Sequence, residues 1–290
     1  MNAKALSTYM GQASVMLTLD CYGRLRPRIE GPARLRPASC GESCGKDQVM
    51  ADARLIGAAV RAAVRNPVGY VREAVRLPLR QEAAKRMLAL PVVELADLTG
   101  VEREVSVVLP SGEGHHGWSL RTSEQVILQV LLRARACMTA FEIGTFGGET
   151  TRLVAETLPE HGRVWTIDLP PSDFDLTQDP GEFGGSDIGV AFRSSVAAYK
   201  ITQLFGDSLR FDFSAYEKSA DFVLVDAGHE YANGFADTRT ALRLVRPGGI
   251  ILWHDFDAYW HGLVNGICDA MVGRRLGRLA GTAFAVYCHP

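Results

Sequence analysis

Residues with the chemistry of an active site follow two apolar runs in the second half of the chain. Asp226 and His229 come after "ADFVLV", and His254 and Asp255 come after "GIILW". Carboxylates and imidazoles can move protons or bind a divalent cation. His229, His254 and Asp255 are therefore candidate catalytic residues. Two alternatives stay open, because Asp226 could cap the next helix and His229 could bond to backbone.

The same cluster could hold a metal ion. Asp226, His254 and Asp255 are the candidate ligands, and Mg²⁺ is the first cation to consider. Imidazole suits zinc, iron or nickel better than magnesium. His254 therefore leaves two possibilities open, a metal ligand or a general base.

A second candidate site is the turn in "FEIGTFGGETT", between a strand-like and a helix-like run. Gly144 permits a sharp bend and Gly148 permits a close approach of a ligand. Thr150 opens a helix whose N–H groups point at that ligand. The spacing is GxxxG rather than the dinucleotide pattern GxGxxG. Glu142 would repel a diphosphate and attract a cation such as S-adenosylmethionine.

Further acidic residues follow the next strand candidates. Asp168 could accept hydrogen bonds from both ribose hydroxyls, although NAD would use the same device. Asp207 could accept a hydrogen bond from the adenine amino group, with Ser208 assisting. Each of these could alone be a helix cap, but acidic residues at successive strand ends favour a cofactor site. The predicted cofactor-binding residues are Glu142, Gly144, Gly148, Thr150, Asp168, Asp207, Ser208 and Asp226.

The elements that must position these residues are short apolar strands separated by helical segments. The strand candidates are "MTAFEIG", "RVWTIDL", "KITQLFG", "ADFVLVDA", "GIILWHD" and "TAFAVYCHP". Nearly continuous apolar strands between helices are typical of a parallel sheet covered on both faces. We predict a doubly wound, Rossmann-like α/β domain over residues 120–290. Ser123 is the predicted N-cap of its first helix.

The segments before this domain have a different pattern. Residues 50–119 are predicted to form a helical cap, which Pro67 and Pro78 should break into two or three helices. Residues 1–49, with the repeated "RLRP", are predicted to be a disordered extension, or alternatively a basic tail for an acidic partner. The long acidic loop over residues 170–190 is expected to border the site and to help select the acceptor.

The composition excludes several classes of partner. The net charge of −2 gives no global field that would favour nucleic acid or an anionic membrane. No apolar run approaches the roughly 18 residues that a spanning helix needs. The cysteines are scattered, and Cys40 and Cys44 alone are weak signs of zinc. We therefore expect a cytoplasmic protein with reduced thiols.

The segments "FEIGTFGGETT", "VWTIDLPP", "ITQLFGDS" and "ADFVLVDAGHEYANGFADTRTALRLVRPGGIILWHDF" resemble class I S-adenosylmethionine-dependent methyltransferases. The resemblance covers roughly residues 117–290. It is closest to the branch with macrolide-sugar O-methyltransferases and cephalosporin-hydroxylase-like proteins. It implies a seven-stranded sheet with an antiparallel last strand, S-adenosylmethionine as cofactor, and an oligomer built through the helical cap. It also implies Mg²⁺ on Asp226 and Asp255, with His254 at a position that is often acidic.

The function predicted from the sequence is O-methylation of a small molecule, with a sugar or a glycosylated natural product as the expected acceptor. Two alternatives remain. One is an NAD-linked oxidoreductase on a similar sheet, against which the missing GxGxxG counts. The other is a non-catalytic module that binds the cofactor and supports a partner enzyme.

Overall fold

The structure, a computed structural model, describes residues 66–100, 105–108, 120–173 and 187–290. The predictions for residues 1–49 and for the middle of the 170–190 loop lie outside these ranges. The chain divides into two units, Met1–Pro78 and Leu79–Pro290. The predicted boundary at residues 119 and 120 remains a prediction, since residues 109–119 are not described.

Helix α3 (Pro67–Ala89) crosses the division between the two units. Pro67 starts it, at a position where the missing N–H leaves no intrahelical bond unmade. Pro78 lies inside the helix, so the expected break there is wrong, although the units divide directly after it. The second unit continues with β1 (Val92–Val93) and α4 (Leu95–Thr99).

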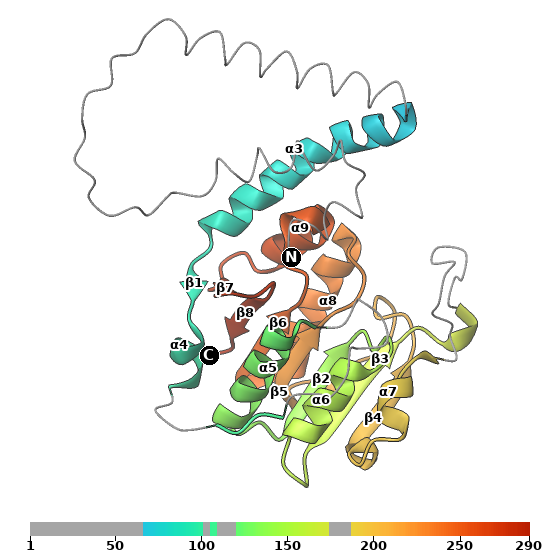
Figure 1. Cartoon of the computed structure of the whole chain (residues 1–290), viewed down its shortest axis with the longest axis vertical. Coiled ribbons are helices and arrows are strands. Elements are labelled where there is room, and N and C mark those ends of the chain that lie inside the picture. Colours follow the sequence, from blue (N-terminus) through green and yellow to red (C-terminus); the bar gives the residue numbers. More distant parts are fainter. Residues whose placement is uncertain (1–65, 101–104, 109–119, 174–186) are drawn as a thin grey trace, which may run out of the picture. The chain divides into compact units, whose positions relative to one another are not determined.

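The second unit is built on an eight-stranded sheet of order β1-β7-β8-β6-β5-β2-β3-β4 (Figure 1). Its remaining strands are β2 (Thr139–Ile143), β3 (Arg163–Asp168), β4 (Ile201–Phe205), β5 (Ala220–Val225), β6 (Val245–Trp253), β7 (Gly277–Leu279) and β8 (Ala285–Cys288). Strands β2 to β6 pair in parallel, and β8 runs antiparallel to β6, as predicted. The two-residue β1, from the expected helical cap, adds an edge strand to the predicted seven.

Helices cover both faces of this sheet. Helices α5 (Thr122–Ala134) and α6 (Glu149–Thr157) pack on one face, and α8 (Tyr231–Leu244) and α9 (His261–Ala270) pack on the other (Figure 1). Every residue of β5 is buried, with Phe222 and Leu224 in one core and Val223 and Val225 in the other. This two-sided burial confirms the doubly wound fold. Shorter helices complete the unit: η1 (Pro171–Asp173), α7 (Val190–Arg193), η3 (Ala198–Lys200), η4 (Ser214–Tyr216) and η5 (Ala258–Trp260).

The strand order places a crevice at the centre of the sheet. The chain runs outward through β3 and β4 and then crosses back to β5, on the other side of β2. Ligands bind beyond the carboxyl ends of strands at such a switch point. Ile143 pairs with Val225 at these ends, and the Asp226 N–H donates to the Ile143 carbonyl at 2.8 Å. The glycine turn and Asp226 therefore lie next to each other.

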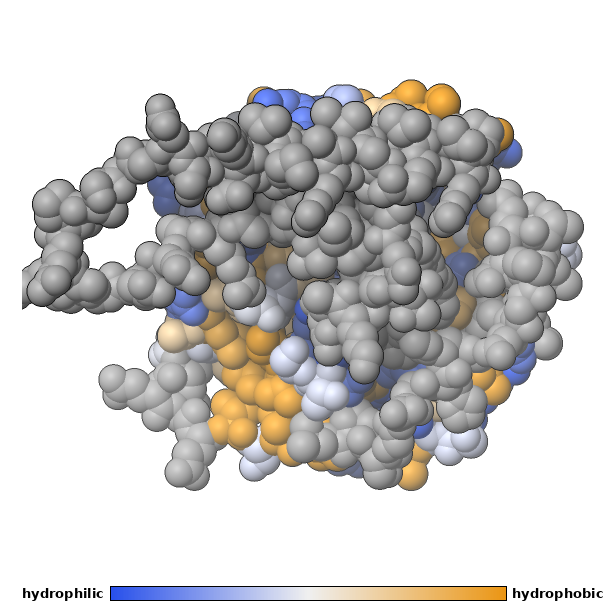
Figure 2. All heavy atoms as spheres, turned by 45° about the horizontal axis from the view of Figure 1, so that its top comes forward, coloured by the Kyte–Doolittle hydropathy of each residue, from blue (hydrophilic) through white to orange (hydrophobic). Residues whose placement is uncertain are grey.

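The described surface mixes hydrophobic and hydrophilic residues. Figure 2, a space-filling view of one face, shows hydrophobic and hydrophilic residues side by side on its coloured part. Among the described residues, no helix combines the length and the apolar character needed to cross a bilayer.

Candidate active site

The glycine turn after β2 is shaped by close packing. Gly144 has φ 101°, and a Cβ there would collide with the backbone carbonyl of Asp226. Gly148, at φ 83°, precedes α6, and a Cβ there would lie 2.6 Å from the ring of Phe192. Glycine is therefore required at both positions. The close neighbours are protein groups, whereas the sequence suggested a ligand next to Gly148.

Asp168 organises this turn from the end of β3. Its Oδ2 accepts the N–H groups of Thr145 and Phe146 at 2.9 and 2.7 Å, and its Oδ1 accepts that of Leu169 at 2.8 Å. A carboxylate has about four acceptor sites. One acceptor site remains for a ribose hydroxyl, so Asp168 can bind one hydroxyl directly without giving up a backbone bond.

The sequence suggested that Glu142 lines the crevice with a negative charge, but the structure places this side chain in the interior. It is 3% exposed, and its Oε2 accepts the hydroxyls of Thr151 and Thr166. Burial, reinforced by the charges of Asp226 and Asp168, outweighs these hydrogen bonds and raises the pKa of Glu142 to about 8. Glu142 is therefore mostly neutral at pH 7.

Another carboxylate, which the sequence reasoning missed, reaches the turn instead. A Cβ on Gly147 would collide with the side chain of Glu149, which lies in the first turn of α6 beside the predicted Thr150. A carboxylate there opposes a phosphate at the helix N-terminus. This placement supports the original preference for a ligand without a diphosphate.

The turn after β4 carries Asp207 and Ser208. The Asp207 Oδ1 accepts the Leu209 N–H at 3.0 Å, and its side chain is 40% exposed. The Gly206 N–H donates to the Asp168 carbonyl at 2.8 Å. The residues predicted to bind ribose and adenine therefore lie on adjoining turns.

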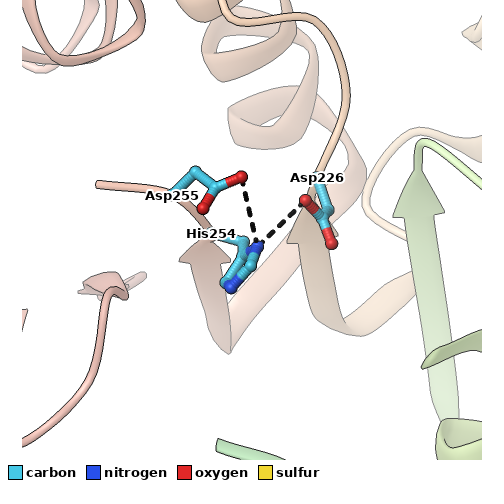
Figure 3. A group of neighbouring side chains, drawn as sticks. All are labelled: Asp226, His254 and Asp255. Atoms are coloured by element: carbon cyan, nitrogen blue, oxygen red, sulfur yellow. Dashed lines mark hydrogen bonds and ion pairs between the residues drawn. The ribbon is translucent and has the colours of Figure 1, made fainter. Parts of the chain in front are cut away.

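His254 stands at the centre of the polar cluster at the ends of β5 and β6 (Figure 3). Its Nδ1 lies 3.1 Å from Asp226 and 3.6 Å from Asp255, and its Nε2 lies 3.6 Å from Glu124. Burial disfavours the imidazolium, but the charge of Asp226 and the hydrogen bonds to Asp226 and Glu124 outweigh burial. Together they raise the pKa of His254 to about 11. Both ring nitrogens are engaged, which leaves His254 poorly placed to act as a general base.

Glu124 is a member of the cluster that the sequence reasoning missed. It is fully buried on α5, where it accepts the N–H groups of Ala283 at 2.8 Å and Arg121 at 3.1 Å. Burial opposes its charge, yet the bond to His254 and the two backbone bonds lower its pKa to about 2. Helix α5 begins one residue before the expected cap, Ser123, and Glu124 caps it from within. Neither this role nor the contact with His254 was readable in the sequence, because the residue three before Glu124 is Arg121 rather than a usual cap.

His229 has the geometry of a general base. Its Nε2 lies 3.0 Å from the Asp255 Oδ2, and its side chain is 29% exposed. Its ring stacks on Trp260, with 3.9 Å between centroids and 15° between planes, and Tyr259 packs edge-on against Trp260. Asp255 adopts φ 52°, a conformation that aspartate tolerates better than most residues.

Three side chains of the polar cluster could hold a divalent cation. Asp226, His254 and Asp255 each offer one ligand atom, and these atoms lie within 4.8 Å of one another. Two carboxylates and an imidazole are suitable ligands. A protonated imidazole has no lone pair for a metal, so binding would expel the His254 proton. Asp226, His254 and Asp255 therefore fit a divalent cation, provided that His254 loses its proton.

Comparisons with known proteins agree with this geometry. Residues 141–256 match the model of a methyltransferase domain family. A protein of Arabidopsis thaliana named as a caffeoyl-CoA O-methyltransferase is 26% identical over 67% of this chain and 71% of its own length. Caffeoyl-CoA O-methyltransferase 2 of Populus trichocarpa is 25% identical over 53% of this chain and 60% of its own length. The chain thus spans about three fifths of the second relative.

Solved structures give similar names at lower identity. The O-methyltransferase TomG from Streptomyces achromogenes, in complex with SAM, is 20% identical over 60% of this chain and 82% of its own, with a TM-score of 0.46. An O-methyltransferase from Bacillus cereus, in complex with SAH, is 18% identical over 73% of this chain and 90% of its own, with a TM-score of 0.44.

The family match decides against the NAD-linked alternative, because it covers the glycine turn, Asp168, Asp207 and the polar cluster. The finer resemblance to macrolide-sugar enzymes remains a prediction, since the relatives above have other names. The sheet, the turn at its switch point and the matched family agree on one conclusion. Residues 141–256 match a methyltransferase domain, and the sheet that carries them has the class I methyltransferase fold.

Proposed function

We propose that this protein transfers the sulfonium methyl group of S-adenosylmethionine to a hydroxyl oxygen of a small molecule. One observation carries the proposal. Asp226, His229, His254 and Asp255 meet at the ends of β5 and β6, and Asp226 directly adjoins the glycine turn at Gly144. A proton-accepting group thus lies beside the place where a class I cofactor is expected.

The cofactor would be held by the turns at the carboxyl ends of β2, β3 and β4. Asp168 offers one acceptor site to the ribose, and Asp207 lies on the adjoining turn for the adenine. Asp226 and Glu149 supply negative charge around the crevice, which favours a cation over a diphosphate. Glu142 supports this site indirectly, through Thr151 at the start of α6.

His229 would accept the proton of the acceptor hydroxyl. Its Nε2–H points to Asp255, so the lone pair is on Nδ1, for which the described residues record no partner. Asp255 stabilises the imidazolium that forms, and stacking on Trp260 fixes the plane of the ring. The oxygen lone pair then attacks the methyl carbon as the carbon–sulfur bond breaks, which leaves neutral S-adenosylhomocysteine.

A divalent cation would be held by Asp226, Asp255 and the Nδ1 of His254. When bound, it would lower the pKa of the acceptor hydroxyl and orient its oxygen. Activity after chelation, and after the return of Mg²⁺, Mn²⁺ or Zn²⁺, tests this part separately.

For the acceptor, a sugar hydroxyl on a glycosylated small molecule remains our first candidate. A phenolic hydroxyl is the second, and two observations favour it. Trp260 and Tyr259 place an indole and a phenol ring beside His229, where an aromatic acceptor could stack. The relatives named above are caffeoyl-CoA O-methyltransferases.

The test uses the purified full chain with S-adenosylmethionine and two acceptor panels, glycosides and catechols. Mass spectrometry should detect a gain of one methyl group in one panel. Binding of S-adenosylhomocysteine without methylation, in wild type and His229→Ala alike, would favour the non-catalytic module instead. An oligomer and a cytoplasmic location remain predictions, and light scattering tests the first.

A further inference from the structure

A stack of aromatic rings joins His229 to helix α3. The Trp260 ring lies against His229, with 3.9 Å between centroids, and the Tyr259 ring packs edge-on against Trp260 at 4.8 Å. The Arg80 guanidinium carbon lies over the face of Tyr259, 4.4 Å from the ring centroid. A cation at this distance from an aromatic face is attracted to the ring. Two rings of η5 therefore connect the candidate base to a charged residue of α3.

Close backbone packing brings His229 and Trp260 together. His229 precedes α8 and Trp260 precedes α9, and these two helices lie side by side (Figure 1). Gly262 allows the close approach, because a Cβ there would lie 3.0 Å from the His229 carbonyl oxygen. Backbone packing does not fix the ring planes, which depend on side-chain torsions. Tyr259 is 37% exposed and Trp260 is half-buried, so burial alone does not hold these rings.

The part of α3 that carries Arg80 is held firmly on α9. Ala83 is fully buried in the core. Arg86 donates to the Asn265 Oδ1 at 3.0 Å and to the Asp269 Oδ1 at 2.6 Å. Residues three apart share one face of a helix, so Arg80 lies on the face that packs on α9. The guanidinium therefore reaches η5 from a fixed support.

His229 needs such support because a general base acts only from a defined position. It must lie within hydrogen-bond reach of the hydroxyl proton. The hydrogen bond recorded for its ring among the described residues runs from Nε2 to the Asp255 Oδ2, at 3.0 Å. The ring can still turn about a single hydrogen bond, whereas stacking on Trp260 fixes its plane. The order of the Trp260 ring therefore sets where the Nδ1 of His229 points.

We propose that Arg80 is a positioning residue for His229. Arg80 holds Tyr259 against Trp260, and Trp260 fixes the plane of the imidazole whose Nδ1 takes the proton of the acceptor hydroxyl. This inference rests on the proposed function, since it needs His229 as the base. Arg80 acts through the two rings and takes no part in the chemical step.

Nuclear magnetic resonance reports the stack without any measurement of activity. The full chain, isotope-labelled on its histidine and tryptophan rings, should show a nuclear Overhauser effect between the ring protons of His229 and Trp260. Trp260→Leu assigns this signal by removing it. Arg80→Met keeps an unbranched side chain without the charge, and it should lose most of the signal. Arg80→Lys retains a cation for the Tyr259 ring and should restore the signal.

Kinetics then connect the stack to catalysis, with the glycoside or catechol that is methylated in the panels above as acceptor. Arg80→Met should lower kcat by about three- to tenfold, the range expected of a partly exposed cation–π contact. The KM for S-adenosylmethionine should stay unchanged, since the turns expected to hold it follow β2, β3 and β4. Arg80→Lys should recover most of the lost rate. Arg76→Met, the same change at an exposed arginine of α3, should behave as wild type.

A double variant tests whether Arg80 acts through Tyr259. Arg80→Met combined with Tyr259→Leu should lose no more kcat than Tyr259→Leu alone. A further loss in the double variant, an unchanged Overhauser effect in Arg80→Met, or an equal defect in Arg80→Lys would overturn the inference. If Arg80→Met does not fold, an unchanged Overhauser effect in Tyr259→Leu decides against the inference.

Failure of the proposed function gives a different result. A wild-type kcat in His229→Ala would refute the proposed role of His229, and the inference with it. The Overhauser effect between His229 and Trp260 would persist in the unaltered protein in that case, so this failure is distinguishable from the absence of the stack.

Discussion

The buried Glu142 gives the sharpest quantitative prediction. Glu142→Gln keeps the size and shape of the side chain and leaves an oxygen to accept from Thr151 or Thr166, but it removes the ionisable group. Wild type must either keep a proton on Glu142 or bury a charge, and burial raises the pKa of this carboxyl to about 8. The glutamine of the variant does not ionise, so this pH-dependent cost is absent.

The magnitude follows from the two pKa values. A group whose pKa is higher in the folded state contributes stability that is fully present below its unfolded pKa and is lost as the pH rises through its folded pKa. For Glu142 this window runs from 4.5 to about 8. At about 1.4 kcal/mol for each pKa unit, wild type should lose about 5 kcal/mol relative to Glu142→Gln across it.

The assay is urea unfolding followed by circular dichroism, with both proteins at a series of pH values from about 4 to 9. The quantity of interest is the difference in free energy of unfolding, in which the titrations of all other groups largely cancel. Glu82→Gln is the matched control, because the Glu82 side chain is 61% exposed and forms only a surface pair with Lys85. The control should give a nearly flat difference.

A flat difference for Glu142→Gln would refute the reasoning. It would mean that Glu142 has the same pKa in the folded and unfolded protein, and that the Thr151 and Thr166 hydroxyls fully compensate for burial. A difference of opposite slope would mean that Glu142 is buried as a stabilised anion. The original expectation of a charged Glu142 at the crevice would then stand.

Three further predictions concern catalysis, metal binding and packing. His229→Ala should lower kcat by about 10²- to 10⁴-fold with an unchanged affinity for S-adenosylhomocysteine, while alanine at the exposed His161 changes neither; equal kcat values would exclude His229 as the base. Calorimetry of Mn²⁺ binding in buffers of different ionisation enthalpy should show about one proton released per ion, and none in His254→Ala; no release from wild type would contradict a protonated His254 that gives up its proton to the metal. Gly144→Ala should lower stability by more than about 2 kcal/mol in chemical denaturation, since the methyl group collides with the Asp226 carbonyl; an unchanged midpoint would show that the turn can move.

Much of the fold could be predicted because periodicity records burial one element at a time. The nearly continuous apolar run of β5 predicted a strand covered on both faces, and all its residues are buried. Residues after parallel strands must meet at one edge, which is why Asp226 and Asp255 could be placed together in advance. The short β1 and the continuity of α3 through Pro78 could not be predicted, because pairing and packing decided them against weak local signals.

The sequence by itself therefore determined the fold class, the switch point and the residues at its strand ends. Only the tertiary structure decided which of those residues are charged, paired or buried. It closed Thr151 and Thr166 over Glu142 and brought Glu124 to His254 from a distant helix. The physical reason is that a side chain's charge depends on solvent access and on partners from other elements, neither of which local spacing contains.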